Sequence, residues 1–213
     1  MYRCVCLFVT VVTPKYQQCF GAQTIHVVTS QPSYLSGLTS NATNCGKAGT
    51  PWILEAAIGQ KVRVTLQVFN AGDVTSSSGS DLSAGCKQRV GSVVDMRTQV
   101  TEILCASAST SAARIPEQVV VSNGNRLQLE FEAEAARSMH FLLRFEAVGC
   151  ADIVRPAHTW LRRTGDQLVV GCNVIKQQWH LRCENDRWVG VIGNCSQRKY
   201  STLSATRFLA VPC

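Results

Sequence analysis

Three stretches between residues 23 and 148 place apolar residues at every second position, and the first of them alternates strictly. This period of two, bounded by turn residues, is typical of strands that bury one face and expose the other to water. Several such strands in one segment predict an all-β sandwich over residues 23–148. The stretches are Lys61–Phe69, Arg126–Ala133 and Met139–Ala147, and turns are expected at Gly59-Gln60 and Asn123-Gly124.

The pattern changes after residue 148, where cysteines and tryptophans gather in a short segment. A segment this short cannot build a large core, and cross-links usually replace the missing core. Residues 149–196 are therefore expected to form a small β module held by two disulfides, with tryptophan in its core. The residues concerned are Cys150, Cys172, Cys183 and Cys195 together with Trp160, Trp179 and Trp188.

The two ends of the chain follow neither pattern. A short basic lead is followed by the uncharged run Cys4–Thr13 and by Pro14, which is the layout of a secretory signal peptide over residues 1–22. The run is too short to span a bilayer, which needs about 20 residues; the alternative is a buried amino-terminal strand. Residues 197–213 read as a disordered or truncated tail, so a membrane link would require a carboxy-terminal anchor that this sequence lacks. The polar stretch Asp73–Ser83 is expected to be a mobile loop.

Eleven cysteines indicate an oxidised, extracellular protein, either secreted or at the cell surface. Two sequons, at Asn41 and Asn194, agree with this compartment and predict N-glycosylation. Zinc is the competing use of the cysteines, since Cys172, His180 and Cys183 could supply ligands, but paired C-x2-C knuckles are absent from the sequence. The partners of Cys19, Cys45 and Cys213 stay open.

The net charge of +7 comes from scattered residues rather than from a basic stripe interleaved with aromatics. Nucleic acid is therefore not an expected partner. The sequence also lacks the motifs H-E-x-x-H, G-x-S-x-G and G-x4-G-K-[ST]. His140 and His180 fall within strand patterns and are interpreted as structural. We expect no enzymatic activity and no cofactor.

Residues 23–148 resemble a CUB domain, an extracellular antiparallel β-sandwich. The resemblance rests on Pro51-Trp52-Ile53, Gly59-Gln60 with the strand Val62–Phe69, the cysteines Cys86 and Cys105, and Ser122–Asn125 leading into Leu127–Phe131. It implies a Cys86–Cys105 disulfide, which would contribute about 3 kcal/mol in the loop-entropy model.

The chain departs from calcium-binding CUB domains directly after Cys86, which matches the third cysteine of those domains. Those domains present a cluster of acidic residues, whereas this chain has Cys86-Lys87-Gln88-Arg89. Calcium needs several oxygen ligands and would be repelled by these cations. We therefore expect no metal site, and interpret Asp73 and Asp95 as surface acids.

Residues 149–196 resemble a divergent, shortened sushi domain. The resemblance implies the pairs Cys150–Cys183 and Cys172–Cys195, and a tryptophan buried against them at Trp188. The order CUB then sushi-like module is similar to that of uncharacterised invertebrate surface proteins. The supporting stretches are Gly165-Asp166, Val169–Cys172, Trp179–Cys183 and Arg187–Gly190.

These features together predict an extracellular module that binds protein or glycan, as the ectodomain part of a surface receptor or adhesion protein. The alternative is a freestanding secreted auxiliary factor or protease regulator. Trp179 and Trp188 are expected in the core, and Trp160 in an exposed, turn-rich segment. An exposed aromatic beside two guanidinium groups can combine apolar burial with bidentate bonding, so Trp160, Arg162 and Arg163 form the predicted contact surface. The alternative there is a solvated pair of arginines beside a packed indole.

Overall fold

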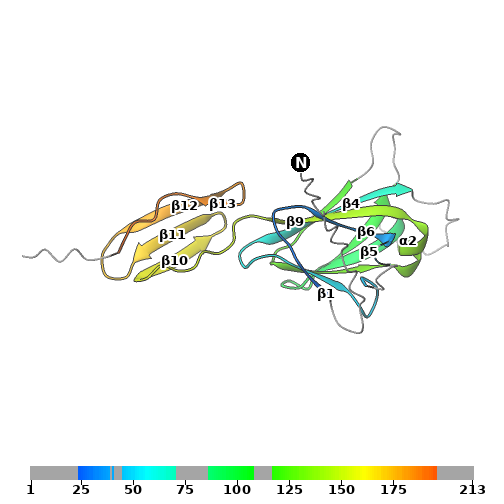
Figure 1. Ribbon diagram of the computed structural model, residues 1–213, viewed down its shortest axis with the longest axis horizontal. Helices are drawn as coiled ribbons and strands as arrows, with labels where there is room; N and C mark the ends of the chain where they lie inside the picture. Colours follow the sequence, from blue (N-terminus) through cyan, green and yellow to red (C-terminus); the bar gives the residue numbers. More distant parts are fainter. Residues whose placement is uncertain (1–23, 39, 41–44, 71–85, 108–116, 196–213) are drawn as a thin grey trace, which may run out of the picture. The chain divides into compact units, whose positions relative to one another are not determined.

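The computed structural model of the chain describes residues 24–38, 40, 45–70, 86–107 and 117–195. In these residues the chain is almost entirely β, with the short helix α2 (Ala133–Ser138) (Figure 1). It divides into two compact units, one up to Asp152 and one from Ile153 onward.

The sequence predicted the division at residue 148. Gly149 and Asp152 instead belong to the first unit, because both are hydrogen-bonded to the turn that precedes its strand β4 (Lys61–Asn70). The Gln60 amide donates to the Gly149 carbonyl at 2.9 Å, and the Asp152 N–H donates to the Ile58 carbonyl at 2.7 Å.

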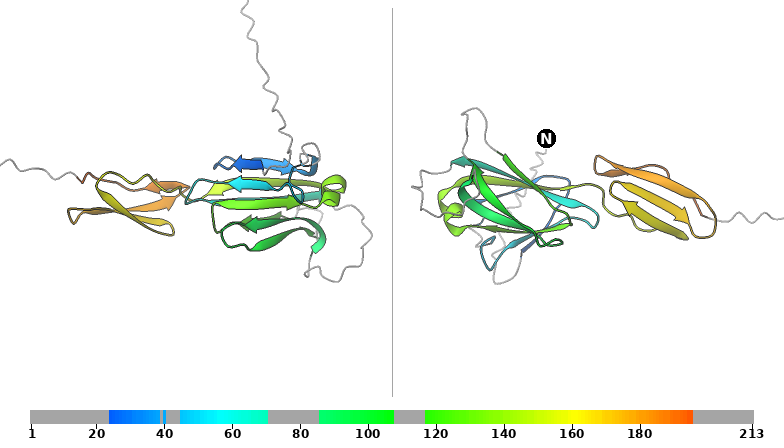
Figure 2. Two further views of the ribbon diagram at one scale, coloured as in Figure 1. Left: turned by 90° about the horizontal axis from the view of Figure 1, so that it is seen from below. Right: turned by 180° about the vertical axis from the view of Figure 1, so that it is seen from behind.

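The first unit is a sandwich of two sheets, seen as layers in Figure 2. The five-stranded sheet has the order β1 (Thr24–Val27), β3 (Trp52–Glu55), β8 (Arg126–Phe131), β5 (Cys86–Asp95) and β6 (Thr101–Ser107). The four-stranded sheet has the order β2 (Ser33–Ser36), β9 (His140–Val148), β4 (Lys61–Asn70) and β7 (Glu117–Val121). The pairs are antiparallel, as expected, except that β1 runs parallel to β3.

The three alternating stretches form β4, β8 and β9, so the predicted all-β sandwich is confirmed. The second stretch ends two residues early, at Phe131, because the chain turns into α2. The helix buries Ala135 and Ala136 against the core. This helix was not predicted from the sequence, since a helix of six residues is too short to show a clear period of its own.

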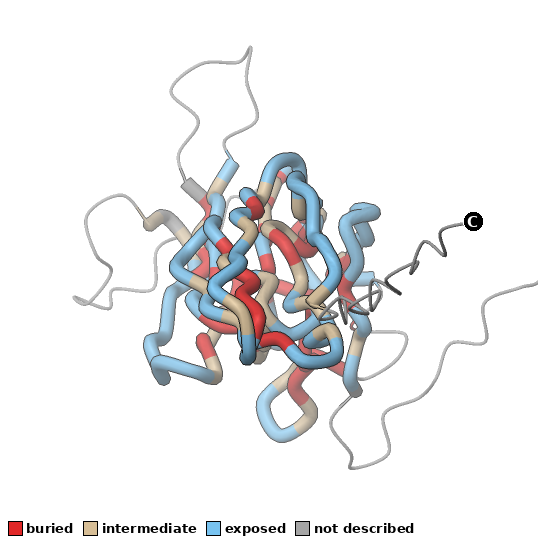
Figure 3. The backbone as a smooth tube through the Cα atoms, turned by 90° about the vertical axis from the view of Figure 1, so that its left-hand side faces the viewer, coloured by how far each residue is buried: buried red, intermediate tan, exposed pale blue. Residues whose placement is uncertain are grey.

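The core of the sandwich is one continuous cluster contributed by both sheets. Figure 3 colours the buried residues of both units red. The largest fully buried side chain of the cluster is Trp52, which is 1% exposed. The Trp52 ring meets Phe131 edge-on, with 5.5 Å between ring centroids. Gly46 lies so close to this indole that a side chain there would collide with it. His26 packs edge-on against Trp52 as well, and burial lowers the pKa of His26.

The turn between β7 and β8 connects both sheets through its hydrogen bonds. The Ser122 hydroxyl accepts from the Val62 N–H at 2.7 Å, on the four-stranded sheet. The Asn125 amide donates to the Ala56 carbonyl at 3.0 Å, directly after β3 of the five-stranded sheet. The polar side chains of Ser122 and Asn125 therefore hold the β7–β8 turn to both sheets.

Gln118 of β7 reaches across to the edge of the other sheet. Its amide oxygen accepts from the Cys105 N–H and its amide nitrogen donates to the Ile103 carbonyl, each at 2.8 Å. Both partners are backbone groups of β6, the last strand of the five-stranded sheet. One side chain thus takes the place of a neighbouring strand along this edge.

The second unit is one antiparallel sheet with the order β10-β11-β12-β13. Its strands are β10 (Thr159–Thr164), β11 (Gln167–Cys172), β12 (Gln178–Glu184) and β13 (Arg187–Val189).

Several expectations fall on residues outside those the structure describes. They are the signal peptide 1–22, the loop Asp73–Ser83, the tail 197–213, the sequon at Asn41, and Cys19, Asp73 and Cys213. Within the described residues, no helix has the length and apolar character that crossing a membrane requires.

Candidate functional site

The four-stranded sheet of the second unit has two unlike faces. Cross-strand partners share a face, and successive residues alternate between faces. We call the covered side the core face and the other side the open face. The core face carries Thr159, Leu161, Arg163, Leu168, Val170, Cys172, Trp179, Leu181, Cys183 and Trp188. The open face carries Trp160, Arg162, Thr164, Gln167, Val169, Gly171, Gln178, His180, Arg182, Glu184, Arg187 and Val189.

The core face is packed despite its small size. Leu168, Val170 and Leu181 are buried, and Trp179 and Trp188 pack against them while staying half-buried. Gly193 lies against the Trp179 indole so closely that a side chain there would collide with the ring. The expected place of Trp179 and Trp188 in the core is therefore confirmed.

Disulfides hold the segment after β13 in place. Cys172, at the end of β11, is bonded to Cys195, as the sushi resemblance implied. In the first unit, Cys86 is bonded to Cys105 between β5 and β6, as the CUB resemblance implied. Cys150 and Cys183 are also disulfide-bonded. Zinc is excluded at the candidate cysteines, because a disulfide sulfur is no longer the thiolate that zinc requires.

Cys45 of the first unit is disulfide-bonded too. The bonds in both units indicate that the chain folds in an oxidising compartment.

Trp160 and Arg162 lie on the open face, both exposed. Trp160 is opposite Gly171 on β11, and its indole lies over that glycine, where a methyl group would be 2.1 Å from a ring carbon. Position 171 must therefore be glycine for the ring to lie on the sheet. The contact with Gly171 covers only part of the indole, so Trp160 remains 36% exposed.

Arg162 continues a row of side chains across the sheet. It is opposite Val169 on β11, which is opposite His180 on β12. His180 is in a strand, as expected, but its side chain is exposed on the open face rather than part of a core. Neighbouring strands are about 4.8 Å apart, so Arg162 and His180 lie within reach of one ligand.

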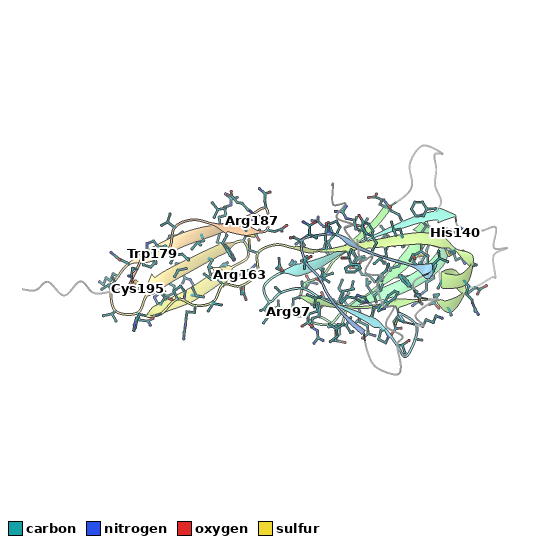
Figure 4. The ribbon with its side chains drawn as sticks, in the orientation of Figure 1. Arg97, His140, Arg163, Trp179, Arg187 and Cys195 are labelled. Atoms are coloured by element: carbon teal, nitrogen blue, oxygen red, sulfur yellow. A yellow bond between two sulfur atoms is a disulfide. The ribbon has the colours of Figure 1, made fainter. Side chains whose placement is uncertain are left out.

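The open face carries more positive than negative charge. Its charged residues are Arg162, Arg182 and Arg187 against Glu184. Arg182 and Glu184 form a loose ion pair at 4.0 Å and remain 75% and 52% exposed. In Figure 4, Arg187 and Cys195 lie at the two far ends of the second unit's sheet.

The predicted grouping of Trp160, Arg162 and Arg163 is wrong in one member. Trp160 lies in strand β10 rather than in a turn-rich segment. In a strand, adjacent residues point to opposite faces, so Arg163 lies on the core face. Its guanidinium carbon is 5.0 Å from the centre of the Trp188 ring, in a cation–π contact. His180 and Arg182 share the open face with Trp160 and Arg162. They were not predicted from the sequence, because the cross-strand pairing that groups them is not visible in a single strand.

The interpretation of Asp95 as a surface acid is also wrong. Asp95 is 6% exposed at the end of β5. Its carboxylate accepts from the N–H groups of Arg97, at 2.8 Å, and Thr98, at 3.2 Å, and from that of Asn123. Burial by itself would raise the pKa of Asp95, but the backbone hydrogen bonds outweigh it and the pKa is lowered. Asp95 thus fastens the β5–β6 turn to the β7–β8 turn.

The hollow beside Asp95 does not offer a ligand site. Its volume is about 20 Å³, which is room for about one water molecule. In the described part of the chain, no three His, Cys, Asp or Glu side chains are grouped as a metal site would require.

The comparisons with known proteins assign no family. No protein-family model matches this chain, and neither does any curated protein.

Proposed function

We propose that this protein is an extracellular module that binds protein or glycan, as the ectodomain part of a surface receptor or adhesion protein, and that the open face of its second unit is the contact surface. The observation that carries the proposal is the composition of that face. It combines an exposed indole at Trp160 with exposed arginines on three strands of one sheet. Aromatic and arginine side chains are enriched where proteins recognise partners.

An extracellular location is supported by the disulfides of both units. The exposed Asn194 is in a position where a glycan could be attached. The resemblance to a CUB domain followed by a sushi-like module is supported by a two-sheet sandwich with Cys86–Cys105 and a small sheet with Cys172–Cys195. Modules of both kinds recognise other molecules, and we propose binding rather than catalysis here.

The choice of the open face over the core face has a physical basis. On the core face, side chains are used for packing, because the unit has little else to form a core. On the open face, Arg162, His180 and Arg187 are exposed and free of any such packing duty. A partner can bind there without disturbing the fold.

The test compares adjacent arginines that point to opposite faces. The full chain carrying Trp160→Ala with Arg162→Ala is labelled and its binding to cultured animal cells is measured beside wild type. We expect about tenfold weaker binding, equal to about 1.4 kcal/mol. Arg162→Glu is a second variant that should also weaken binding, and it leaves the Trp160–Gly171 packing in place.

Arg163→Ala is the matched control, since it removes the same charge from the core face. It should bind as wild type does, provided that the melting temperatures of all variants confirm folding. If the open-face variants bind cells as well as wild type, the open face is not the contact surface.

A further inference from the structure

We infer that the ligand of the open face is a sulfated glycan chain, of the kind found on cell surfaces and in extracellular matrix. This inference rests on the proposed function and names the partner class for the same surface. Three features support it: the charge of the face, the single aromatic platform at Trp160, and the small share of apolar side chains on the face, where Val169 and Val189 accompany Trp160.

The charge of the open face fits a polyanion. Arg162 lies on β10, Arg182 on β12 and Arg187 on β13, so positive charge extends across the sheet rather than along one strand. A guanidinium offers donors in a planar fork that matches the oxygens of an anionic group, and it is always charged. A linear chain with repeated sulfates can contact several of these groups at once, which a single anion cannot.

Acidic residues restrict where such a chain can lie. Glu184 pairs with Arg182, and Asp166 and Asp186 are in the two turns at that end of the sheet. Arg162 and His180 lie in the neighbouring row, away from these turns. The region that favours an anion therefore runs from Trp160 and Arg162 on β10 to His180 on β12.

The indole of Trp160 adds a platform for a sugar ring. It lies over Gly171, so the strand beneath it supports the ring without a competing side chain. Arg162 follows two residues later on the same face, about 6.6 Å further along the strand. A sugar ring on the indole would thus place its anionic substituents near the guanidinium.

A protein partner fits this face less well. The buried centre of a protein interface is depleted of charged residues and more apolar than its rim. Here one row of the open face runs from Arg162 on the edge strand β10 through Val169 on β11 to His180 on β12, and Val169 is the apolar residue of that row. A row with polar side chains at both of its ends suits a hydrated, anionic chain better than a protein partner.

The experiment measures binding of the full-length oxidised protein to heparin, a heavily sulfated glycan, in rising salt. Arg162→Ala should weaken binding about tenfold, since a hydrogen bond to a charged group contributes about 1.5 kcal/mol. Arg182→Ala should weaken it less, because Arg182 pairs with Glu184 outside the region that favours an anion. Arg163→Ala should bind as wild type. Trp160→Phe keeps a ring on Gly171 and should weaken binding less than Trp160→Leu.

Two further probes separate sulfated glycan from other polyanions. Desulfated heparin and polyglutamate should bind at least tenfold more weakly than heparin. Equal binding of polyglutamate, or an equal loss for Arg162→Ala and Arg163→Ala, would overturn the inference. If heparin does not bind while the open-face variants still lose binding to cells, the sulfated glycan is wrong and the proposed recognition surface stands. If binding to both heparin and cells is unaffected by the open-face variants, both are wrong.

Discussion

The two units of this protein maintain similar β structure by different means. In the first unit, two sheets bury each other, and the core runs continuously from Val28 to Ala147. In the second unit, one sheet buries Leu168, Val170 and Leu181, and the rest of its cover comes from half-buried tryptophans and the segment tied down by Cys195. A sandwich uses both inner faces for stability, whereas a single sheet can leave one face free.

This difference bears on where recognition can occur. In the second unit, stability depends on the core face and on covalent links, so the exposed side chains of the open face, unlike Gly171 beneath Trp160, can change at little cost to the fold. Arg162 and Arg163 show the division most clearly, because they are adjacent in sequence and serve opposite faces. Substitutions can test whether the two units depend on their different supports.

The largest effect is expected in the sandwich core. Trp52→Ala removes a fully buried ring and should lower the free energy of unfolding of the first unit by about 4 kcal/mol. Hydrogen exchange resolved by residue would follow the two units separately, and the amides of β11 and β12 should keep their protection. Val119→Ala, on an exposed side chain of β7, should change stability by less than about 0.5 kcal/mol. Loss of protection in both units would mean that they are not independent.

Removing the disulfide of the second unit should have the next largest effect. Cys172→Ser with Cys195→Ser should cost about 3 kcal/mol through the entropy of the unfolded chain. Because the second unit has little core, that loss should leave it largely unfolded, as seen in faster proteolysis and a red-shifted tryptophan emission.

The matched pair for that test is Cys86→Ser with Cys105→Ser in the first unit. The cost should be similar, but the sandwich should remain folded because its core is larger. Equal resistance of both units to the loss of their disulfides would contradict the comparison between core and cross-link.

An intermediate effect is expected at Asp95. Asp95→Asn keeps the shape but loses the charge that accepts three backbone N–H groups, and should cost about 2 kcal/mol at neutral pH. The pKa of Asp95 is lowered from 3.8, so its contribution is complete above that pH and is lost as the pH falls below it toward the folded-state pKa. Denaturant unfolding between pH 6 and pH 2 should show the gap between wild type and variant narrowing. A constant gap would mean that the carboxylate charge does not contribute.

The smallest effect is expected at Arg163. Arg163→Ala removes the cation–π contact with Trp188 and should destabilise the second unit by about 0.5–1 kcal/mol. Arg162→Ala, on the open face, should be neutral in the same thermal unfolding measurement. A larger loss at Arg162 than at Arg163 would reverse the assignment of faces.

Sequence patterns predicted the parts of the fold in which apolar residues alternate. β4, β8 and β9 belong to this class, since each buries a regular set of valine, leucine or phenylalanine. β10 does not, because Arg163 occupies a core-face position and lies over Trp188, so the strand shows no apolar alternation. For the same reason the sequence placed Trp160 in a turn and grouped it with the wrong arginine.

Only part of the candidate site was predicted, because the sequence shows neighbours along one strand but not those on the next strand. Trp160 and Arg162 stand out as an aromatic and a cation close together in sequence. His180 and Arg182 join them only through the register of β10, β11 and β12, which depends on contacts between distant segments. Asp95 was misread because its charge suggests exposure, whereas the Asp-Met-Arg-Thr turn provides backbone donors that a carboxylate can accept when buried.

Gln118 has a consequence for self-association. Strands at the edge of a sheet offer unpaired backbone groups to other chains, and such edges promote aggregation. At positions 103 and 105 of β6, the side chain of Gln118 already occupies the carbonyl and the N–H that an incoming strand would need. The Gln118 amide therefore blocks backbone pairing of another chain at these two positions of β6.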